Sequence, residues 1–388
     1  MALANGSEFY HAPKNLLAFE QALGAAPAFL AKLKDVVLVK ELPSLQFLDF
    51  WAKHGLELCR FVQFGDSLAN SSLLTEQLEA LRPWSWNKSS HRLLHPLKSL
   101  CNKSFRESPL MAWREDLRQW SSREQLVNLW PSLWQVLPHE WLVAESDIPI
   151  VAKSGEEIEA LLADWQQMVL KSPWSSSGRG VQMVRKSVLD VSRMQWIQSV
   201  LRAQGVVMVE RLFDKIADFS IQFAVTDTEV KCLGVSRFTT NTNGGYLGND
   251  VGVFPQTDYW LWLEDKLDML CEAVSETLRA AGVCAVYRGA LGVDMMCVRA
   301  ADGKFRIHPL VELNLRPTMG LVALELERLL EPGVGGCLSM YFDPKLSFGA
   351  FCEAADWQGA RSATGGLLSG IFPLSAPSES PFGLYLKL

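Results

Sequence analysis

Two polar side chains interrupt an apolar run near the end of the chain, and they constrain the fold more than any other feature. The run HPLVELNLRP places Glu312 and Asn314 two positions apart. Residues two apart on a β-strand share a face, so these side chains point the same way. A second apolar run, GALGVDMMCV, carries Asp294. Buried carboxylates are costly unless they are paired or bound to metal. The two runs therefore predict neighbouring strands of an α+β or α/β fold with oxygen ligands on one face.

The same side chains predict a magnesium site. Mg²⁺ is usually held by one or two carboxylates together with substrate phosphates, and Asp294, Glu312 and Asn314 offer suitable hard oxygen atoms. Arg316 lies two positions beyond Asn314, and its guanidinium matches a carboxylate or a phosphate oxygen. The alternative to a metal site is that Asp294 and Glu312 have a structural role and pair only with other protein groups.

A Ser/Gly segment follows a lysine at the end of another predicted strand. Lys171 ends that strand, and the segment after it contains Ser175, Ser176, Ser177, Gly178, Arg179 and Gly180. Small residues let backbone N–H groups approach phosphate oxygens, and the lysine adds a positive charge. The segment lacks the Walker A pattern, and no helix follows it, so a plain hairpin is the alternative.

Two further features gain meaning only in combination with these. The segment VMVERLF, with Glu210 and Leu212, can present backbone donors and acceptors to an adenine edge, and Asp218 can accept hydrogen bonds from ribose hydroxyls. Taken alone, acids at strand ends are usually solvated. The Gly/Asn-rich segment 237–250 is either a ligand-covering loop or a long hairpin loop.

Hydrophobic periodicity predicts the other elements. Ser154 opens an S-x-x-E capping box, which marks a helix start. A Trp-rich helical region spans about 76–141, with a local excess of Lys and Arg; its aromatics are either core or a wall that recognises substrate. Helices are expected at 44–54, 155–165, 191–203 and 258–281, strands at 35–40, 56–62, 167–171, 181–184, 206–210, 217–224, 230–235, 289–299 and 305–314, and a surface loop at 362–381.

Composition excludes several classes of protein. The 388 residues carry 37 Lys+Arg against 43 Asp+Glu, a net charge of −6, which argues against a basic nucleic-acid surface. No apolar run is long enough to span a membrane, and the start of the chain does not resemble a signal peptide. The 8 cysteines form no CxxC pair, so a zinc knuckle or redox dithiol is not expected. We therefore expect a cytoplasmic protein that binds neither nucleic acid nor membrane.

The order of these motifs resembles that of the ATP-grasp superfamily: first the lysine and the Ser/Gly segment, then the Glu210 hinge, Asp218, Asp294 and the E-x-N-x-R strand. That superfamily includes D-alanine–D-alanine ligase, biotin carboxylase and glutathione synthetase. The resemblance covers roughly residues 150–330, under half of the chain. It implies two α+β subdomains that clamp ATP, predicted at 145–208 and 209–388, after an N-terminal α/β domain at 1–144. The last of these segments includes a C-terminal extension.

The resemblance also implies roles for individual residues. Lys171 and the loop 175–180 would bind phosphates, Glu210 and Leu212 adenine, and Asp218 the ribose. Mg²⁺ would lie on Asp294, Glu312 and Asn314. Arg316 would hold the transferred phosphoryl group or the substrate carboxylate, Arg288 would face the substrate, and Lys103 would reach the phosphates from the preceding domain.

The resemblance favours an ATP- and Mg²⁺-dependent ligase that joins a carboxylate to an amine through an acyl phosphate. Its substrates would be small molecules or peptides. A homodimer is one assembly that the sequence allows. A small-molecule kinase with the same nucleotide site and a non-catalytic ATP-binding regulator are the alternatives. The longer spacing between Asp294 and Glu312 than in D-alanine–D-alanine ligase, and Trp174 inside the phosphate loop, leave the substrate undetermined.

Overall fold

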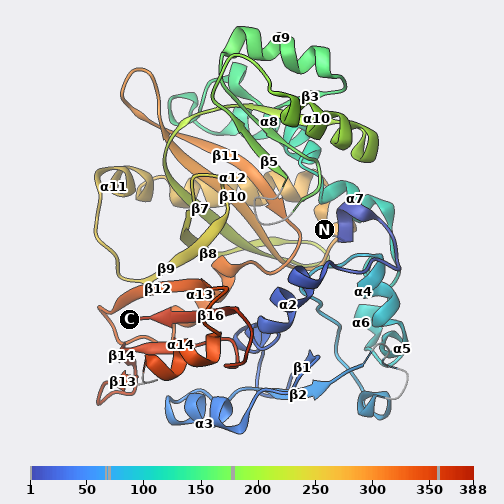
Figure 1. The fold of residues 1–388 in the computed structure, drawn as a ribbon, viewed down its shortest axis with the longest axis vertical. Helices are drawn as coiled ribbons and strands as arrows, with labels where there is room; N and C mark the ends of the chain where they lie inside the picture. The colour runs from blue at the N-terminus through green and yellow to red at the C-terminus, as the bar shows by residue number, and fades with distance from the viewer. Residues whose placement is uncertain (1, 66–67, 69–70, 176–179, 356–358) are drawn as a thin grey trace.

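The computed structural model describes residues 2–65, 68, 71–175, 180–355 and 359–388. Among these residues, eight strands form one antiparallel sheet in the order β11-β10-β7-β8-β9-β12-β16-β15 (Figure 1). The strands are β7 (Asp214–Val225), β8 (Val230–Thr240), β9 (Tyr246–Gly252), β10 (Gly289–Arg299), β11 (Phe305–Asn314), β12 (Gly335–Phe342), β15 (Ile371–Pro373) and β16 (Phe382–Lys387). The bounds predicted for β10 and β11 are confirmed.

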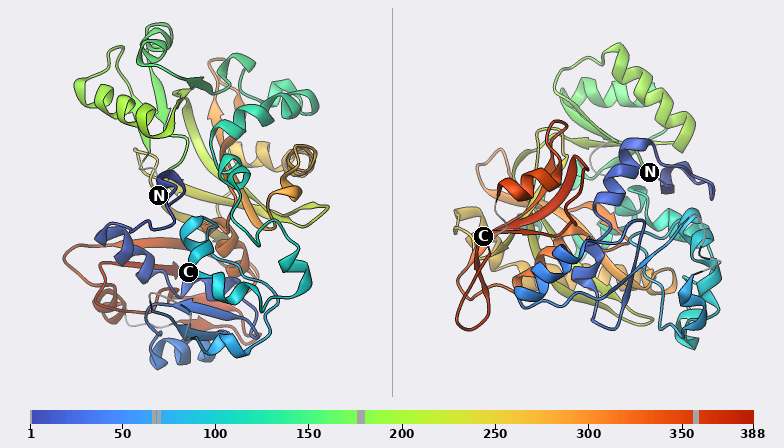
Figure 2. Two further views of the ribbon diagram at one scale, coloured as in Figure 1. Left: turned by 90° about the vertical axis from the view of Figure 1, so that its right-hand side faces the viewer. Right: turned by 60° about the horizontal axis from the view of Figure 1, so that its bottom comes forward.

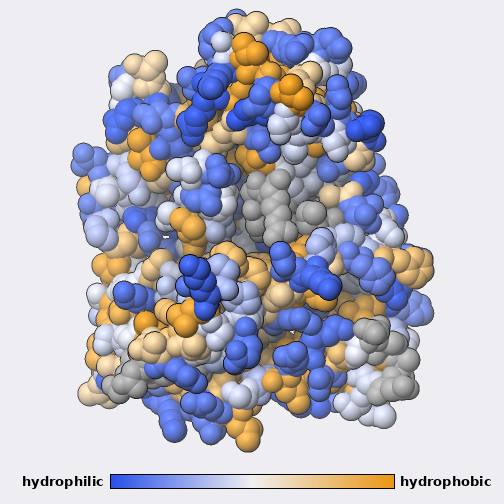
Figure 3. Space-filling view, in the orientation of Figure 1, coloured by the Kyte–Doolittle hydropathy of each residue, from blue (hydrophilic) through white to orange (hydrophobic). Residues whose placement is uncertain are grey.

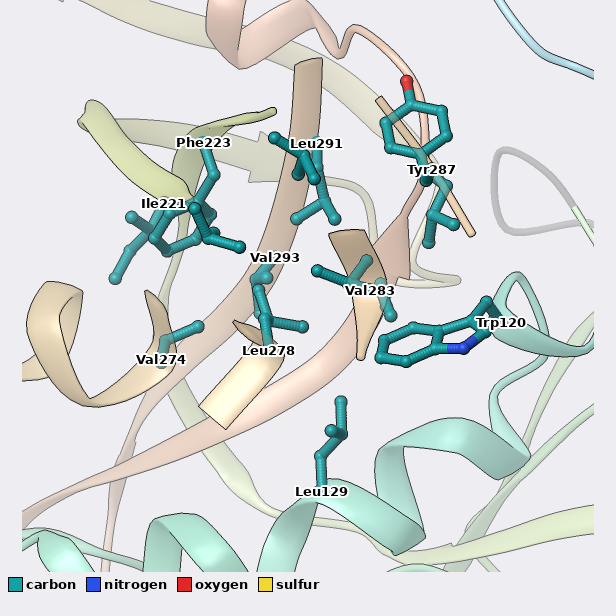
Figure 4. Close-up of a cluster of buried hydrophobic side chains, with 14 of the residues drawn as sticks. Trp120, Leu129, Ile221, Phe223, Val274, Leu278, Val283, Tyr287, Leu291 and Val293 are labelled. Carbon is teal, nitrogen blue, oxygen red and sulfur yellow. The ribbon is translucent and has the colours of Figure 1, made fainter. Parts of the chain in front are cut away.

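One face of this sheet is apolar because the strand residues alternate in character. On β7, Phe219, Ile221 and Phe223 are buried within the main core, whereas the residues between them are polar. Ile221 and Phe223 lie opposite side chains of α12 (Leu267–Ala280), including Leu278, as Figure 4 shows. The helix α8 (Glu124–Val136) covers the same core. Each fully buried side chain of this size contributes about 1.5–3 kcal/mol, so this face anchors the sheet and leaves the other face for polar groups.

A smaller sheet lies at one end of the molecule, at the top of Figure 1. Its order is β3-β6-β4-β5, with β3 (Ile150–Ala152), β4 (Met168–Lys171), β5 (Val181–Val184) and β6 (Val207–Arg211). The helices α9 (Gly155–Trp165) and α10 (Val191–Gln204) bury its apolar residues. The Ser154 hydroxyl accepts a hydrogen bond from Glu157 N, which confirms the predicted helix start. The predicted β4–β5 hairpin is also confirmed. We call this unit the lid.

The N-terminal part packs against the C-terminal strands. It contains a parallel pair, β1 (Val36–Val39) with β2 (Arg60–Gln63), and the helices α2 (Lys14–Ala22) and α3 (Leu45–Lys53). Trp51 is fully buried, and its Nε1 donates a hydrogen bond to Pro373 O at 2.8 Å. Figure 2 shows this contact between the two ends of the chain as blue and red segments side by side. The two segments share one core, although more than 300 residues separate them.

Short helices fill the Trp-rich region, and its aromatics are mostly core. Trp86, Trp120 and Trp130 are buried, which confirms the core reading for them. The helices before α8 are α4 (Lys88–Leu93), α5 (His95–Lys98), α6 (Lys103–Arg106) and α7 (Glu115–Trp120).

Four predictions were wrong in part. The strand predicted at 56–62 is β2, which begins only at Arg60. The tail 362–381 is not a surface loop, because β15 joins the large sheet and Phe372 and Leu374 are fully buried. The helix at 258–281 is two helices, α11 (Asp258–Glu264) and α12. The segment 237–250 is largely strand, since β8 continues to Thr240 and β9 begins at Tyr246. The remaining elements are α1 (Ala2–Asn5), α13 (Met319–Glu327), α14 (Phe348–Ala354), β13 (Ala360–Arg361) and β14 (Leu367–Ser369).

The surface is mixed, and one thiol pair lies below it. Polar and charged residues cover most of the face seen in Figure 3, with apolar residues scattered among them. Within the described ranges, no helix has the length and apolar character needed to cross a bilayer. The described cysteines are free thiols, but Cys232 Sγ on β8 lies 3.0 Å from Cys271 Sγ on α12.

Candidate active site

The face of the large sheet opposite the main core carries polar side chains in cross-strand rows. Strand register defines each row, because paired residues on neighbouring strands point to the same face. The first row is Gly234, Gln222, Gly292 and Asn314; the second is Ser236, Ser220, Asp294 and Glu312; the third is Phe238, Asp218, Met296 and His308. The structure thus places Asp218 and the three predicted metal ligands on one face of four adjacent strands.

The three predicted metal ligands are neighbours. Asp294 is paired in register with Glu312, and Asn314 Nδ2 donates a hydrogen bond to Asp294 Oδ2 at 3.1 Å. Burial, and next the negative charge of Glu312, raise the pKa of Asp294 to about 7, while Ser220, Arg316 and Asn314 act in the opposite direction. Two carboxylates this close resist joint ionisation unless a cation is added.

The donor set fits Mg²⁺ better than a softer metal. Within the described part of the chain, no three His, Cys, Asp or Glu side chains gather into a metal-binding group. Two carboxylates and an amide leave several coordination positions for phosphate oxygens and water, which is the usual arrangement for Mg²⁺ with a nucleotide. The pair Asp294 and Glu312, with Asn314 beside it, could therefore hold a nucleotide-bound Mg²⁺.

Arg123 reaches this site from the segment just before α8, and the sequence analysis missed it. Its side chain is 5% exposed, and its Nη2 donates to Glu312 Oε1 at 2.6 Å. Its Nη1 donates to Ser172 O and to Ser175 Oγ, both at 2.7 Å. One guanidinium therefore joins a predicted metal ligand to the start of the predicted phosphate loop. No local motif marks it, since its neighbours read SSREQ.

Lys171 lies at the end of β4, where it forms a buried ion pair. Its Nζ is 2.6 Å from Glu210 Oε2, and both side chains are nearly inaccessible to solvent. Backbone pairing of β4 with β6 brings these two side chains together. The lysine is thus held at the junction of the lid and the large sheet, and the Glu210 carboxylate is engaged by it.

The phosphate loop is described only at its two ends. Ser172 N donates to Gly180 O at 2.8 Å, which closes the hairpin. A Cβ at Gly180 would lie 2.1 Å from Ser172 Oγ and 2.4 Å from Ser175 Cβ, so only glycine fits there. Trp174 packs under the Arg118 guanidinium and donates through Nε1 to Arg118 O, which anchors the loop on α7. The predicted residues Ser176, Ser177, Gly178 and Arg179 lie outside the described residues.

Asp218 is on the expected face but already has protein partners. Its Oδ2 accepts hydrogen bonds from Lys215 Nζ at 2.5 Å and from Thr240 Oγ1 at 2.7 Å. Leu212 is half-buried in the connection between β6 and β7. This connection links the lid to the large sheet, so Leu212 lies in a hinge between them.

Comparison with known proteins gives a consistent fold. No protein-family model matches the chain. Over 300 residues the chain is 24% identical to a [butirosin acyl-carrier protein]–L-glutamate ligase of Niallia circulans. That match covers 77% of this chain and 65% of the relative, so the chain spans less than two thirds of that protein.

Solved structures match over almost the whole chain. Biotin carboxylase of Campylobacter jejuni in complex with β,γ-ATP has a TM-score of 0.52 at 12% identity, with 95% of this chain and 85% of that chain covered. N5-carboxyaminoimidazole synthetase of Staphylococcus aureus in complex with ADP has a TM-score of 0.50 at 12% identity, with 96% and 90% covered. Both are ATP-grasp enzymes. This chain has the ATP-grasp fold. The fold that the motifs predicted is confirmed.

In this ATP-grasp structure, the three remaining predicted residues lie in different surroundings. Arg316 follows β11, and its charge partly opposes the burial that raises the pKa of both Asp294 and Tyr287, so it borders the metal row. Arg288 directly precedes β10, half-buried, beside a pocket of about 390 Å³. Lys103 lies on α6 with its side chain 80% exposed, 3.7 Å from Glu107. Arg123, which the sequence did not indicate, reaches Ser175 of the phosphate loop from the N-terminal part.

Proposed function

We propose that this protein is an ATP- and Mg²⁺-dependent ligase that joins a carboxylate to an amine through an acyl phosphate. One observation carries the proposal: Asp294, Glu312 and Asn314 converge in adjacent strands, and Arg123 links them to the segment after Lys171. The alternation of side chains along each strand places these polar groups on one face. They do not contribute to the apolar core on the other face. The ATP-grasp fold supports a nucleotide between lid and sheet.

The charged side chains suit phosphoryl transfer. A bound Mg²⁺ on Asp294, Glu312 and Asn314 would neutralise charge on the β- and γ-phosphates. Lys171 supplies positive charge from the lid, Arg123 from the segment before α8 and Arg316 from the end of β11. Phosphoryl transfer needs charge neutralisation and in-line positioning more than covalent help from the protein, and this set of residues provides both.

The reaction balances without a protein nucleophile. A carboxylate oxygen of the acid attacks the γ-phosphorus, the bond to the β-phosphate oxygen breaks, and ADP leaves. An uncharged amine then attacks the acyl carbon, and inorganic phosphate leaves with the electron pair of the C–O bond and takes up the proton that the nitrogen loses. The amide is the product. No general base is required of the chain, because the acyl phosphate is already activated.

The relative from Niallia circulans suggests the kind of substrate to test. Its name states that it joins L-glutamate to an acyl-carrier protein. We include in the proposal that an amino acid is one substrate and that the other is either a small molecule or a group carried on a protein.

The decisive experiment measures ADP formation and identifies the product. The protein is incubated with ATP, Mg²⁺ and a panel of acids and amines, with L-glutamate and a carrier protein included, and the products are analysed by mass spectrometry. A ligase releases ADP and phosphate and adds one amide bond. A product that retains the phosphoryl group favours the kinase alternative, and AMP formation contradicts both.

A matched pair of variants tests the metal row. Glu312→Ala should lower turnover by about 100-fold, since it removes a group that stabilises charge in the transition state. Glu276→Ala is the control, because Glu276 is an exposed glutamate paired only with Arg279 on the outside of α12. If nucleotide still protects the Glu312 variant from thermal unfolding in a Mg²⁺-dependent manner, the metal assignment is wrong. Mg²⁺-dependent nucleotide protection of the native protein without turnover on any pair of substrates favours the non-catalytic alternative.

A further inference from the structure

His308 is a buried histidine whose two ring nitrogens lack partners. It lies on β11, and its side chain is fully inaccessible to solvent. Within the described residues, neither Nδ1 nor Nε2 has a hydrogen-bond partner. Buried polar groups in folded proteins are almost always hydrogen-bonded, and an unpaired one costs about 1–3 kcal/mol. A missing partner therefore needs an explanation at this position.

The position of His308 connects it to the candidate nucleotide site. It belongs to the same cross-strand row as Met296 and Asp218, directly beside the row of Asp294 and Glu312. This row lies on the face that we assign to the nucleotide. By register, His308 is therefore on the same face of the sheet as Asp294 and Glu312, and its ring also contacts the edge of the main core.

The neighbours of the ring belong to the junction between lid and sheet. Phe213, in the hinge after β6, packs edge-on against the imidazole with ring centroids 5.6 Å apart. Trp130 of α8 packs against it at 5.4 Å. Lys171 is near enough for its charge to act on the imidazole. Hinge, lysine and row 3 meet at the place where an adenine would enter between the two sheets.

The imidazole is neutral under ordinary conditions. Burial, and next the positive charge of Lys171, lower the pKa of His308 to about 3. A neutral imidazole has one N–H donor and one nitrogen acceptor. A purine base offers both acceptors and an amino donor on its edges, so it can pair with either ring nitrogen.

We propose that His308 hydrogen-bonds the base of the bound nucleotide and contributes to the selection of adenine. This inference rests on the proposed function, since it presupposes a nucleotide between lid and sheet. Phe213 covers the ring in the present structure and belongs to the hinge. Binding of the base to His308 therefore requires Phe213 to move aside with the hinge.

The main test compares His308→Phe with the native protein. Phenylalanine keeps an aromatic ring between Trp130 and Phe213 but removes both nitrogens. The affinity for ADP should fall by about 10-fold, because one buried hydrogen bond contributes about 1–1.5 kcal/mol. The affinity for inorganic tripolyphosphate, which has no base, should not change. The thermal stability of the ligand-free protein should rise, because an unpaired buried polar group is gone.

Base analogues locate the contact. The 10-fold difference in affinity between the native protein and His308→Phe should disappear for one of two analogues: 7-deaza-ADP, which lacks the N7 acceptor, or purine riboside diphosphate, which lacks the amino group. Combining the protein variant with each analogue makes a double-mutant cycle across the interface. His139→Phe is the control, because His139 is exposed and stacks on Trp134 outside the row. An equal loss for ADP, both analogues and tripolyphosphate would overturn the proposal, as would an unchanged affinity for ADP.

A second measurement works even if the variant fails to fold. In native protein with ¹⁵N-labelled histidine, ADP should shift the ring nitrogen resonances of His308, and tripolyphosphate should shift them much less. Unchanged resonances with saturating ADP refute the contact while leaving the proposed function intact. If the native protein binds neither ADP nor ATP, the proposed function itself fails, and the two failures are thus distinguishable.

Discussion

Replacement of Arg123 by methionine should both destabilise the protein and change its response to Mg²⁺. The guanidinium is 5% exposed and makes three side-chain hydrogen bonds, to Glu312, Ser172 and Ser175. A hydrogen bond to a charged group contributes about 1.5–3 kcal/mol and each neutral one about 0.5–1.5 kcal/mol. Glu312 is 31% exposed and regains water when its partner is removed. The net loss is therefore about 3 kcal/mol.

The Mg²⁺ response follows from competition for one carboxylate. In the native protein Arg123 neutralises Glu312, so free Mg²⁺ without nucleotide must displace a buried guanidinium. In Arg123→Met the carboxylates of Glu312 and Asp294 face each other without that cation. Mg²⁺ should then bind more tightly to the variant than to the native protein and restore part of the lost stability.

Thermal unfolding with and without millimolar Mg²⁺ measures both effects. We expect a fall in Tm of several degrees without Mg²⁺, and a Mg²⁺-dependent rise in the variant that exceeds the rise in the native protein. Arg279→Met is the control, because Arg279 forms an exposed ion pair with Glu276. Equal Mg²⁺ responses in the native protein and the Arg123 variant would refute the reasoning. Steady-state turnover of the variant should also fall, by about 100-fold.

Three other changes have expected outcomes. The pKa of Asp294 is raised to about 7 by burial and Glu312, so the folded state binds the proton more tightly than the unfolded state. Without Mg²⁺, the free energy of unfolding should therefore fall as pH rises from about 4 to 7. Asp294→Asn should remove the part of this fall that is due to Asp294, as measured by urea titrations at each pH. Parallel pH profiles of the native protein and the variant would contradict this reasoning. Gly180→Ala should weaken ATP binding by about 10-fold, measured by calorimetry, because its Cβ would overlap Ser172 and Ser175. Dilute hydrogen peroxide should link Cys232 to Cys271, with one peroxide reduced to water per disulfide, and non-reducing peptide mapping should detect that pair before any other.

The sequence predicted the strands that carry Asp294, Glu312 and Asn314 well because their pattern is local. The alternation that exposes Asp294, Glu312 and Asn314 on one face is a property of the strand itself, and no distant contact is needed to infer it. The bounds of β5, β10 and β11 were correct for the same reason. The helix start at Ser154 depends on a side chain that bonds within four residues, so it too could be predicted.

Features that depend on distant contacts were missed. Arg123 lies 189 residues before Glu312, and only the folded chain brings them together. The Ser/Gly/Pro-rich tail was predicted as loop, but pairing of β15 with β16 and burial of Phe372 against Trp51 make part of it strand. The thiol pair Cys232 and Cys271 likewise joins a strand to a helix across a core. Tertiary pairing outweighs local composition in each case.

The two ion pairs of the site imply that metal and nucleotide bind together. Lys171 is held by Glu210, and Arg123 is held by Glu312, so each cation offered to a polyphosphate already has an anion. A nucleotide alone would leave the carboxylates of Glu312 and Asp294 beside its phosphates, and free Mg²⁺ alone would have to compete with Arg123. A nucleotide with Mg²⁺ would change the Arg123–Glu312 pairing, because Glu312 would hold the metal and Arg123 would become available to a phosphate oxygen. ADP affinity should therefore depend steeply on the Mg²⁺ concentration in the native protein and weakly in Arg123→Met, where no guanidinium is released. Calorimetric titrations at several Mg²⁺ concentrations measure this difference. An equal dependence in both proteins would exclude the exchange.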